Sequence, residues 1–517
     1  MSWQDDVNEI QRRRELGLKM GGQERVDRQH AQGKYTVRER FDRLFDAESF
    51  LEVGSLAGSA TLVDGKVADF APSAYVMGLA EIGGRRVAAG GEDFTVKGAA
   101  MATERRDKLH FAEQMAKEFR IPLVLLMDGA GASIQSIESM GHTYLPNTRD
   151  WSLSMDLLGL VPVVAGVVGP AAGYPAARAM LAHWVCMVRG TGQLFAAGPP
   201  VVRRAIGREI GKEELGGTDV HVHRSGVAEN EATDEDDCFR QIREFLSFMP
   251  DSVWERPPYR EPADRPDRRE EELLTIVPEN RNRPYNMRKL VQLIVDDGRL
   301  FEISPHYGRS VVAGLARMNG HVVGVMANDP RFMGGAIDGP AADKQTHFIE
   351  LCDAFHIPIL NFVDVPGVMV GPQAELEGTL RRGMRAFWMI YQATVPIIDI
   401  MVRKCYGMAG AATNNASRLN LRIAWPSAEW GSLPIEGGVD AAFRRDIETS
   451  TDPAGRRKEL EEQLSQLRSP FVTAEKFGVE DIIDPRDTRR IVIRFLDAAI
   501  PAMSHSLGPK PRYGVRP

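Results

Sequence analysis

Two glycine-containing turns are the parts of this sequence whose residue types could do chemistry. Residues 169–175 read Gly-Pro-Ala-Ala-Gly-Tyr-Pro and follow an apolar run. A proline in the first turn of a helix loses no hydrogen bond, so Pro175 predicts that a helix begins here. Backbone N–H groups at Gly173 and Tyr174 would then face a ligand, as in an anion site or an oxyanion hole. A simple tight turn between strand and helix fits the same residues.

A second turn of this kind occurs at residues 405–412, which read Cys-Tyr-Gly-Met-Ala-Gly-Ala-Ala. Small residues let a backbone approach a ligand closely, or let a helix pack closely on a sheet. Two such turns at matching places favour two facing oxyanion sites, and Gly407, Met408 and Ala409 are the candidate residues of the second.

Each turn has a companion loop that begins with aspartate. The loops read Asp128-Gly129-Ala130-Gly131-Ala132 and Asp364-Val365-Pro366-Gly367, and each follows a short apolar strand. Ligands of open α/β sheets bind at the carboxyl ends of strands. Gly131, Ala132, Pro366 and Gly367 are therefore candidate substrate-binding residues. The aspartates fit the capping of a turn as well as they fit a role in the site.

The two sets of motifs belong to an internal duplication. Several residues are found again, with the same identity, 236 positions later in the chain; Gly78 and Gly314 are one such pair. Two more pairs are separated by 234 positions. The pairs at the longer spacing are Gly78 and Gly314, Lys108 and Lys344, Phe119 and Phe355, Pro122 and Pro358, Asp128 and Asp364, and Gly131 and Gly367. Those at the shorter spacing are Pro162 and Pro396, and Gly173 and Gly407. A constant spacing over several elements indicates two copies of one fold.

The elements of each half alternate between strand and helix. Strands are predicted at residues 86–89, 123–127 and 161–168, and again at 321–326, 359–363 and 397–402. A helix precedes the second strand of each set, with apolar residues at helical spacing: Leu109, Ala112, Ala116 and Phe119 in one half, and Phe348, Leu351, Cys352 and Phe355 in the other. This order predicts an α/β fold with right-handed crossovers.

The chain is long enough for two domains. With 517 residues it exceeds a single hydrophobic core. We expect domains at residues 1–255 and 270–517, joined by a proline-rich linker at 250–269, with a helical arm up to about residue 46.

Composition excludes several classes of function. A net charge of −7 argues against nucleic acid as a partner. The four cysteines lack metal-binding or disulfide spacing, so no metal site is expected. The acidic start argues against a targeting peptide, and no apolar run reaches membrane-spanning length. These features predict a cytoplasmic protein without membrane contact.

Motifs along nearly the whole chain resemble the carboxyltransferase (β) subunits of biotin-dependent acyl-CoA carboxylases. Early in the chain they are Gly21-Gly22, Gln29-His30, Gly33-Lys34, Arg38-Glu39-Arg40 and Asp93-Phe94-Thr95-Val96. Later ones are Glu213-Glu214-Leu215-Gly216-Gly217, Pro284-Tyr285, Asp296-Asp297-Gly298, Val363-Asp364-Val365-Pro366-Gly367 and Arg403-Lys404.

The resemblance implies tandem crotonase-like (ClpP/crotonase) domains. The N-terminal domain of one subunit would bind acyl-CoA and the C-terminal domain of another would bind biotin, commonly in a hexamer of head-to-tail dimers. The implied reaction moves CO2 from carboxybiotin to the α-carbon, or the vinylogous carbon, of an acyl-CoA. An enolate held in backbone oxyanion holes would carry this step without a side-chain base.

This chain differs from the usual family pattern at three places. Gly173-Tyr174 replaces Gly-Gly, Gly407-Met408-Ala409 replaces Gly-Gly-Ala, and Gly131-Ala132-Ser133 replaces Gly-Ala-Arg. The chain also lacks an Ala-Met-Lys-Met biotinylation site, so biotin is expected on a partner biotin carboxylase/carboxyl carrier (α) subunit. An acyl-CoA decarboxylase or transcarboxylase subunit, or a non-catalytic scaffold paralogue in a mixed complex, are the alternative functions.

Overall fold

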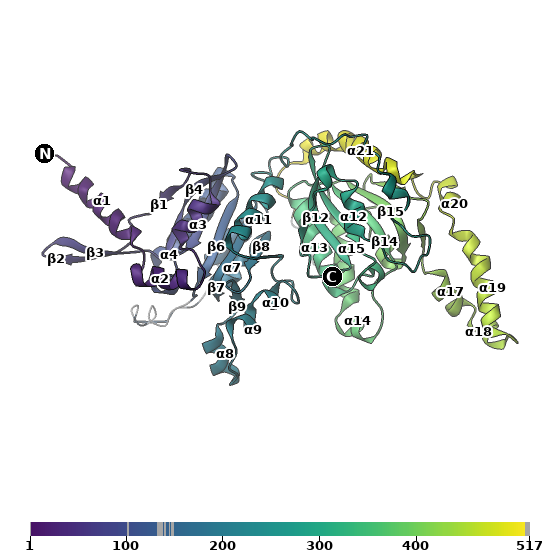
Figure 1. Cartoon of the computed structure of the whole chain (residues 1–517), viewed down its shortest axis with the longest axis horizontal. Coiled ribbons are helices and arrows are strands. Elements are labelled where there is room, and N and C mark those ends of the chain that lie inside the picture. Colours follow the sequence, from purple (N-terminus) through teal and green to yellow (C-terminus); the bar gives the residue numbers. More distant parts are fainter. Residues whose placement is uncertain are drawn as a thin grey trace. The chain divides into compact units, whose positions relative to one another are not determined.

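A computed structural model describes residues 2–100, 103–131, 138, 141–143, 145 and 149–511 (Figure 1). The chain divides into two units, Met1–Glu255 and Arg256–Pro517, and each contains its own eight-stranded sheet. The predicted linker joins the second unit from Arg256 onward, since the N–H of Arg260 donates to the carbonyl oxygen of Gly320 at 3.1 Å.

The sheet of the first unit has the order β1-β4-β5-β6-β7-β8-β10, and β9 pairs with β7. Its first three strands are antiparallel, and the rest pair in parallel. The strands are β1 (Leu51–Val53), β4 (Tyr75–Ile82), β5 (Arg85–Glu92), β6 (Leu123–Gly129), β7 (Val163–Ala172), β8 (Trp184–Val188), β9 (Gln193–Phe195) and β10 (Asn230–Ala232). A separate hairpin is formed by β2 (Gly58–Val63) and β3 (Lys66–Pro72).

The sheet of the second unit repeats this topology strand for strand. Its order is β11-β12-β13-β14-β15-β16-β18, and β17 pairs with β15. The strands are β11 (Phe301–Ile303), β12 (Val311–Met318), β13 (His321–Asn328), β14 (Ile359–Val365), β15 (Ile397–Tyr406), β16 (Leu421–Ala424), β17 (Glu429–Gly431) and β18 (Asp481–Ile482). The duplication and the α/β class predicted from the sequence are confirmed.

Two predicted strands are longer than expected at their carboxyl ends. β7 begins at Val163 but continues to Ala172, and β15 continues to Tyr406. The extra residues are held because the short strands β9 and β17 pair with these ends of β7 and β15. Both glycine turns therefore start from the tip of a paired strand.

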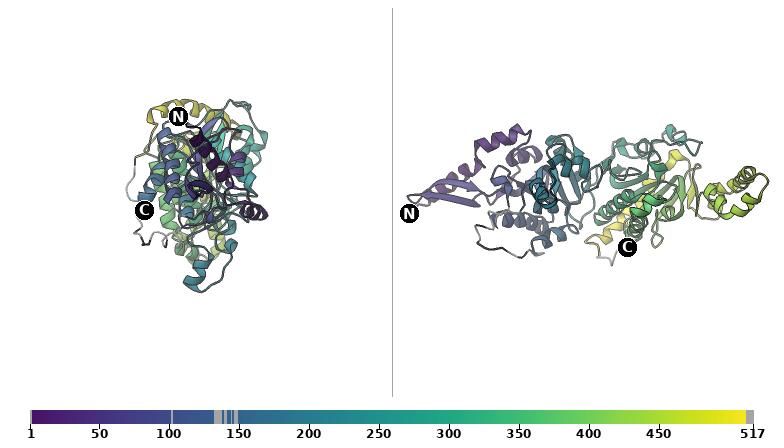
Figure 2. Two further views of the ribbon diagram at one scale, coloured as in Figure 1. Left: turned by 90° about the vertical axis from the view of Figure 1, so that its left-hand side faces the viewer. Right: turned by 90° about the horizontal axis from the view of Figure 1, so that it is seen from below.

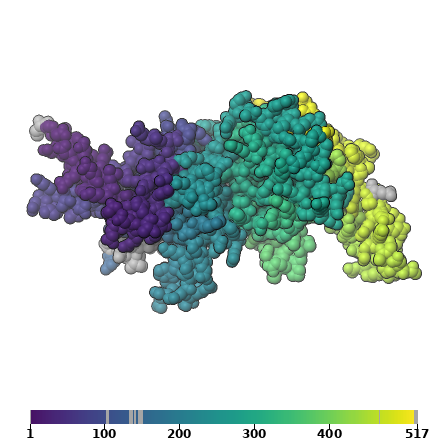
Figure 3. Space-filling view, in the orientation of Figure 1, coloured from purple at the N-terminus to yellow at the C-terminus, as the bar shows by residue number. Residues whose placement is uncertain are grey.

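Helices cover both faces of each sheet. The first unit contains α1 (Gln4–Leu18), α2 (Gln23–Ala31), α3 (Val37–Leu44), α4 (Thr103–Phe119), α6 (Arg149–Leu157), α7 (Tyr174–Ala179), α8 (Pro199–Ile206), α9 (Lys212–Gly216), α10 (Thr218–His221) and α11 (Glu235–Phe248). The second contains α12 (Met287–Gln292), α13 (Gly339–Ala354), α14 (Pro372–Leu376), α15 (Thr379–Gln392), α16 (Gly407–Ala411), α17 (Ile435–Ala442), α18 (Arg444–Thr449), α19 (Pro453–Ser465), α20 (Pro470–Glu475) and α21 (Thr488–Met503). Helices α17–α19 form a small lobe around Val439, Ile447 and Leu460, set apart from the sheet of their own unit (Figures 2 and 3).

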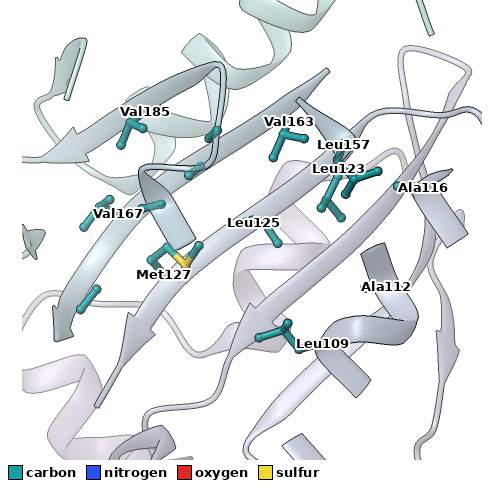
Figure 4. Packing of buried hydrophobic residues seen from close by; sticks show 14 of the residues in the cluster. Leu109, Ala112, Ala116, Leu123, Leu125, Met127, Leu157, Val163, Val167 and Val185 are labelled. Carbon is teal, nitrogen blue, oxygen red and sulfur yellow. The ribbon is translucent and has the colours of Figure 1, made fainter. Parts of the chain in front are cut away.

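The core of the first unit forms where α4 meets the sheet. Leu109, Ala112 and Ala116 are buried against strand residues such as Leu123 and Leu125 (Figure 4). The predicted fourth member of this helix face, Phe119, is wrong: it is the last residue of α4 and is 58% exposed. A side chain at a helix end can extend past the elements that cover the preceding turns. All four predicted positions of the second half are buried.

A buried lysine ties helix to strands in the second unit. Lys344 of α13 donates from Nζ to the carbonyl oxygens of Ser304, Tyr307 and Val311, at 2.8, 3.1 and 2.6 Å. Three donated bonds call for the protonated ammonium group, which these acceptors favour, whereas burial opposes it and lowers the pKa of Lys344 to about 7. The recurrence of lysine at positions 108 and 344 thus marks a structural position rather than a catalytic one.

Replacing Lys344 by methionine should lower the free energy of unfolding by about 3 kcal/mol or more, because three buried carbonyl oxygens lose their donor. Chemical denaturation measures the change. The matched control is Lys289→Met, since the side chain of Lys289 is 45% exposed and pairs with Glu272; it should change stability by less than about 1 kcal/mol. Equal effects at both sites would contradict this role of Lys344.

Candidate functional site

The first glycine turn connects β7 to α7. Gly173 caps the helix with φ of 65°, and α7 begins at Tyr174, one residue before the predicted start at Pro175. The N–H of Gly173 donates to the carbonyl oxygen of Phe195 at 2.9 Å and so closes the pairing between β7 and β9. Within this chain that N–H is engaged, so an oxyanion at this turn depends on Tyr174 and its neighbours.

The loop after β6 lies directly against this turn. A Cβ atom on Gly131 would sit 2.6 Å from the carbonyl oxygen of Ala172 and 3.2 Å from the backbone nitrogen of Tyr174. Only glycine allows such a close approach. Two predicted site residues distant in sequence, Gly131 and Tyr174, are therefore neighbours, whereas Ala132 lies outside the described residues.

The side chain of Tyr174 packs toward α6. Its ring lies 4.7 Å from that of Trp151, centroid to centroid, at an interplanar angle of 54°. It also contacts the buried core of the first unit. The ring thus occupies space between α7 and α6 on the core side of the turn.

Asp128 is the anchor of the first turn and has no exposed surface. Its carboxylate accepts hydrogen bonds from Gln29 at 2.8 Å, Lys34 at 3.1 Å and Arg40 at 3.0 Å. These residues come from α2, α3 and the segment between them, so Asp128 fastens the N-terminal arm beneath the site. A carboxylate with two cationic partners and no exposure is a structural anchor, not a catalytic base.

The space for this cluster is created by Gly169. A Cβ atom there would lie 1.9 Å from Oδ1 of Asp128. The sequence alone assigned no role to Gly169. The available signal was the 234-residue spacing of the duplication, which pairs Gly169 with Arg403.

Asp364 performs the same task in the second unit with different partners. Arg403 reaches it at 2.9 Å, the hydroxyl of Tyr285 donates to it at 3.0 Å and the N–H of Lys404 donates at 3.1 Å. The cation of the second unit thus comes from the neighbouring strand β15, where Arg403 occupies the position that Gly169 has on β7. Both aspartates coincide with a shift in strand register, between Met127 and Gly129 and between Val363 and Val365. Such irregularities redirect a strand end, here toward the turn.

A cavity of about 20 Å³ lies under the second glycine turn. The predicted residues Met408 and Ala409 line it, and Gly407 begins α16 beside them. The loop that carries Pro366 and Gly367 reaches the cavity through Val365 and Val368. The structure thus brings the predicted residues of this turn together with α13 and α15. Their catalytic and binding roles stay predictions.

Sequence reasoning missed the polar groups of this cavity. Asn361 lines it from β14, and its amide Nδ2 donates to Oδ1 of Asp399 at 2.7 Å. Asp399 lies fully inside the unit, where burial raises the pKa of its carboxyl well above 3.8. The sequence signal that could have identified these groups is that Asn361 and Asp399 each interrupt an otherwise apolar strand segment.

The cysteines offer no alternative nucleophile among the described residues. Cys186, Cys238 and Cys352 are buried, and burial raises the pKa of the Cys405 thiol to about 12. Over the same part of the chain, no cluster of histidine, cysteine or carboxylate residues could hold a metal ion. No helix within the described ranges is long and apolar enough to cross a membrane.

Comparison with known proteins agrees with this geometry. Residues 28–510 match the family described as the carboxyl transferase domain. The carboxyltransferase subunit of propionyl-CoA carboxylase from Haloferax mediterranei is 35% identical, over 95% of this chain and 96% of that protein. The alpha subunit of methylmalonyl-CoA decarboxylase from Veillonella parvula is also 35% identical, over 92% of each chain.

A solved structure of transcarboxylase 12S superposes with a TM-score of 0.90 at 32% identity, covering 100% of this chain and 99% of that one. The resemblance proposed from the sequence motifs is therefore confirmed. With its duplicated sheets, paired turns and matched length, this chain belongs to the carboxyl transferase family, as a carboxyltransferase subunit of the acyl-CoA carboxylase type.

Proposed function

We propose that this chain moves a carboxyl group between the α-carbon of an acyl-CoA and biotin carried by another polypeptide. The observation that carries the proposal is the pair of equivalent glycine turns, each anchored by a buried aspartate at the carboxyl end of β6 or β14. Relatives of nearly full length are named for propionyl-CoA and methylmalonyl-CoA, which supports a short acyl-CoA as substrate.

The chemistry demands stabilisation of negative charge on a thioester oxygen. Carboxylation or decarboxylation at an α-carbon passes through an enolate, and backbone donors aimed at its oxygen lower the barrier. The first turn, with Tyr174 and Gly131, is assigned to the acyl-CoA. The second turn, with Gly407, Met408 and Ala409, is assigned to biotin, which when bound supplies or accepts the carboxyl group.

The cavity under the second turn, at about 20 Å³, has room for little more than one water, so a head group would lie at the turn itself and not inside the cavity. Apolar side chains such as Met326, Ile349 and Ile390 form most of the lining, and its polar members are Asn328, Gln345, Asn361 and Thr413. Met408 is unbranched and flexible, so its side chain can adjust the width of the cavity.

Assembly is part of the proposal. Transcarboxylase 12S assembles as a hexamer, and its solved structure holds methylmalonyl-CoA. We extend the hexamer to this chain, with head-to-tail dimers in which the first turn of one copy serves the second turn of its neighbour. The partner is a biotin carboxylase/carboxyl carrier subunit, and the cytoplasm is the expected location.

The test reconstitutes the purified chain with its biotinylated partner. Alone, the chain should bind no avidin and carboxylate no acyl-CoA. With the partner, ATP and bicarbonate, a carboxylase should incorporate labelled bicarbonate into propionyl-CoA. Release of CO2 from methylmalonyl-CoA without ATP would instead identify a decarboxylase, and binding of the partner with no turnover in either direction would identify a scaffold.

Tyr174→Gly should change the choice of substrate. Removing the ring opens space beside Trp151, so the ratio of kcat/KM for longer acyl-CoAs over acetyl-CoA should rise by about 10- to 200-fold. The control Trp151→Leu removes the ring partner but retains Tyr174, and should lower stability with a smaller change in this ratio. If Tyr174→Gly lowers every substrate equally, Tyr174 does not select the acyl group.

A further inference from the structure

One buried carboxylate of the first unit binds two helices at once. Glu113 lies on α4 and is 1% exposed. Its Oε1 accepts a hydrogen bond from Nη2 of Arg178 on α7 at 2.5 Å, and another from the hydroxyl of Ser154 on α6. Arg178 and Ser154 are buried as well. Glu113 thus fastens both α6 and α7 to α4 through a single oxygen atom.

The two helices that Glu113 holds carry the aromatic pair of the first turn. Tyr174 precedes Arg178 by four residues on α7, and Trp151 precedes Ser154 by three residues on α6. Residues three or four apart lie on the same face of a helix, one turn from each other. The ring contact, 4.7 Å between centroids, therefore lies one helical turn from the bonds to Glu113. With six residues, α7 is too short to keep its direction without such tertiary contacts.

The bond between Arg178 and Glu113 joins two charges. Burial opposes the charge of the guanidinium, but the carboxylate of Glu113 favours it, and the pKa of Arg178 is raised. Removing one member alone would leave an uncompensated charge inside the unit, which is strongly destabilising. A variant that removes both charges together avoids this penalty.

The positions equivalent to Glu113 and Arg178 are apolar in the second unit. The 236-residue spacing pairs Glu113 with Ile349 of α13, and the 234-residue spacing that applies at the turns pairs Arg178 with Ala412. Ile349 and Ala412 both line the small cavity under the second turn. The same fold therefore forms without an ion pair at this place. Among the described residues, Oε2 of Glu113 and Nε of Arg178 have no hydrogen-bond partner, so stability alone does not account for the pair.

We propose that Glu113 and Arg178 are positioning residues that set the size of the acyl-binding space at the first turn. The inference rests on the proposed function, in which this turn binds the acyl group of an acyl-CoA. By fixing α6 and α7 relative to α4, the pair holds the ring of Tyr174 against Trp151. The fixed ring then limits the length of acyl chain that fits beside it, which selects short acyl groups.

The experiment measures the dissociation constants of propionyl-CoA, hexanoyl-CoA and free CoA by calorimetric titration of the full chain. The double variant Glu113→Ile with Arg178→Ala copies the apolar pair of the second unit. Because its ring at Tyr174 is no longer held, the affinity for hexanoyl-CoA relative to propionyl-CoA should rise by about tenfold or more, whereas the dissociation constant of free CoA, which has no acyl group, should change by less than about twofold.

A milder variant keeps the test decisive if the double variant does not fold. Ser154→Ala removes one oxygen atom and only the bond to α6, and it should shift the same ratio in the same direction by about threefold. The matched control is Lys117→Met. Lys117 also joins α4 to α6, through Asp156 at 3.3 Å, but both side chains are partly exposed, so the pair contributes little and the ratio should stay at the wild-type value.

Three outcomes would overturn the inference. They are a wild-type ratio in the folded double variant and in Ser154→Ala, an equal weakening of all three ligands, and a shift in Lys117→Met as large as that in the double variant. Thermal unfolding followed by circular dichroism establishes which variants are folded.

The titration also separates this inference from the proposed function, because binding requires no turnover. If the wild-type chain transfers no carboxyl group but prefers propionyl-CoA, and the double variant loses that preference, the positioning role is confirmed while the reaction is not. If the wild-type chain is active with its biotinylated partner and the variants keep the wild-type ratio, the proposed function stands and the inference fails. If the wild-type chain binds no acyl-CoA, the inference fails as well.

Discussion

The buried carboxylate at the carboxyl end of β6, repeated on β14, is the interaction on which both turns depend. At this point the strand shifts register against its neighbour, and the chain must leave the sheet toward a glycine turn. A shift of this kind leaves backbone groups to be satisfied locally. Asp364 accepts the N–H of Lys404 on the neighbouring strand, and the N–H of Asp128 is itself bonded to Glu92 at 2.8 Å. These bonds hold the loop after the aspartate in position relative to the glycine turn.

The two units pair the buried aspartate with cations from different parts of the chain. A fully buried carboxylate needs a cation close by, because its desolvation is costly. The first unit recruits Lys34 and Arg40 from the N-terminal arm and leaves room for them at Gly169. The second unit supplies Arg403 from the strand. The arm is thereby part of the support of the first turn, which explains why helical residues far from the sheet in sequence belong to the same unit.

The cores beneath the turns have also diverged. In the first unit the space beside the turn holds the packed rings of Tyr174 and Trp151. In the second, a small cavity remains, with Met408 above and the Asn361–Asp399 pair at the sheet. One scaffold duplicated within a chain has therefore acquired an aromatic turn and a polar one. The two turns therefore differ in chemical character although one fold carries both.

The sequence by itself determined the duplication, the alternation of strand and helix, and the place of both turns. These features are local or periodic: apolar runs of strand length, helical spacing, and glycine and proline at chain reversals. The constant spacing of 236 and 234 residues then fixed which residues correspond. Phe119 shows the limit of periodicity, because a helix pattern does not say where the covering sheet ends.

The tertiary structure alone decided which polar groups meet. The role of Asp128 as an anchor depends on Lys34 and Arg40, which lie 94 and 88 residues away, and the buried Asp399 accepts a hydrogen bond from Asn361, 38 residues away. The engagement of the Gly173 N–H by Phe195 likewise follows from the pairing of β7 with β9. Hydrogen bonds between side chains act over about 3 Å and depend on direction. Strand register and side-chain orientation therefore decide which of them form, and a local sequence pattern specifies neither.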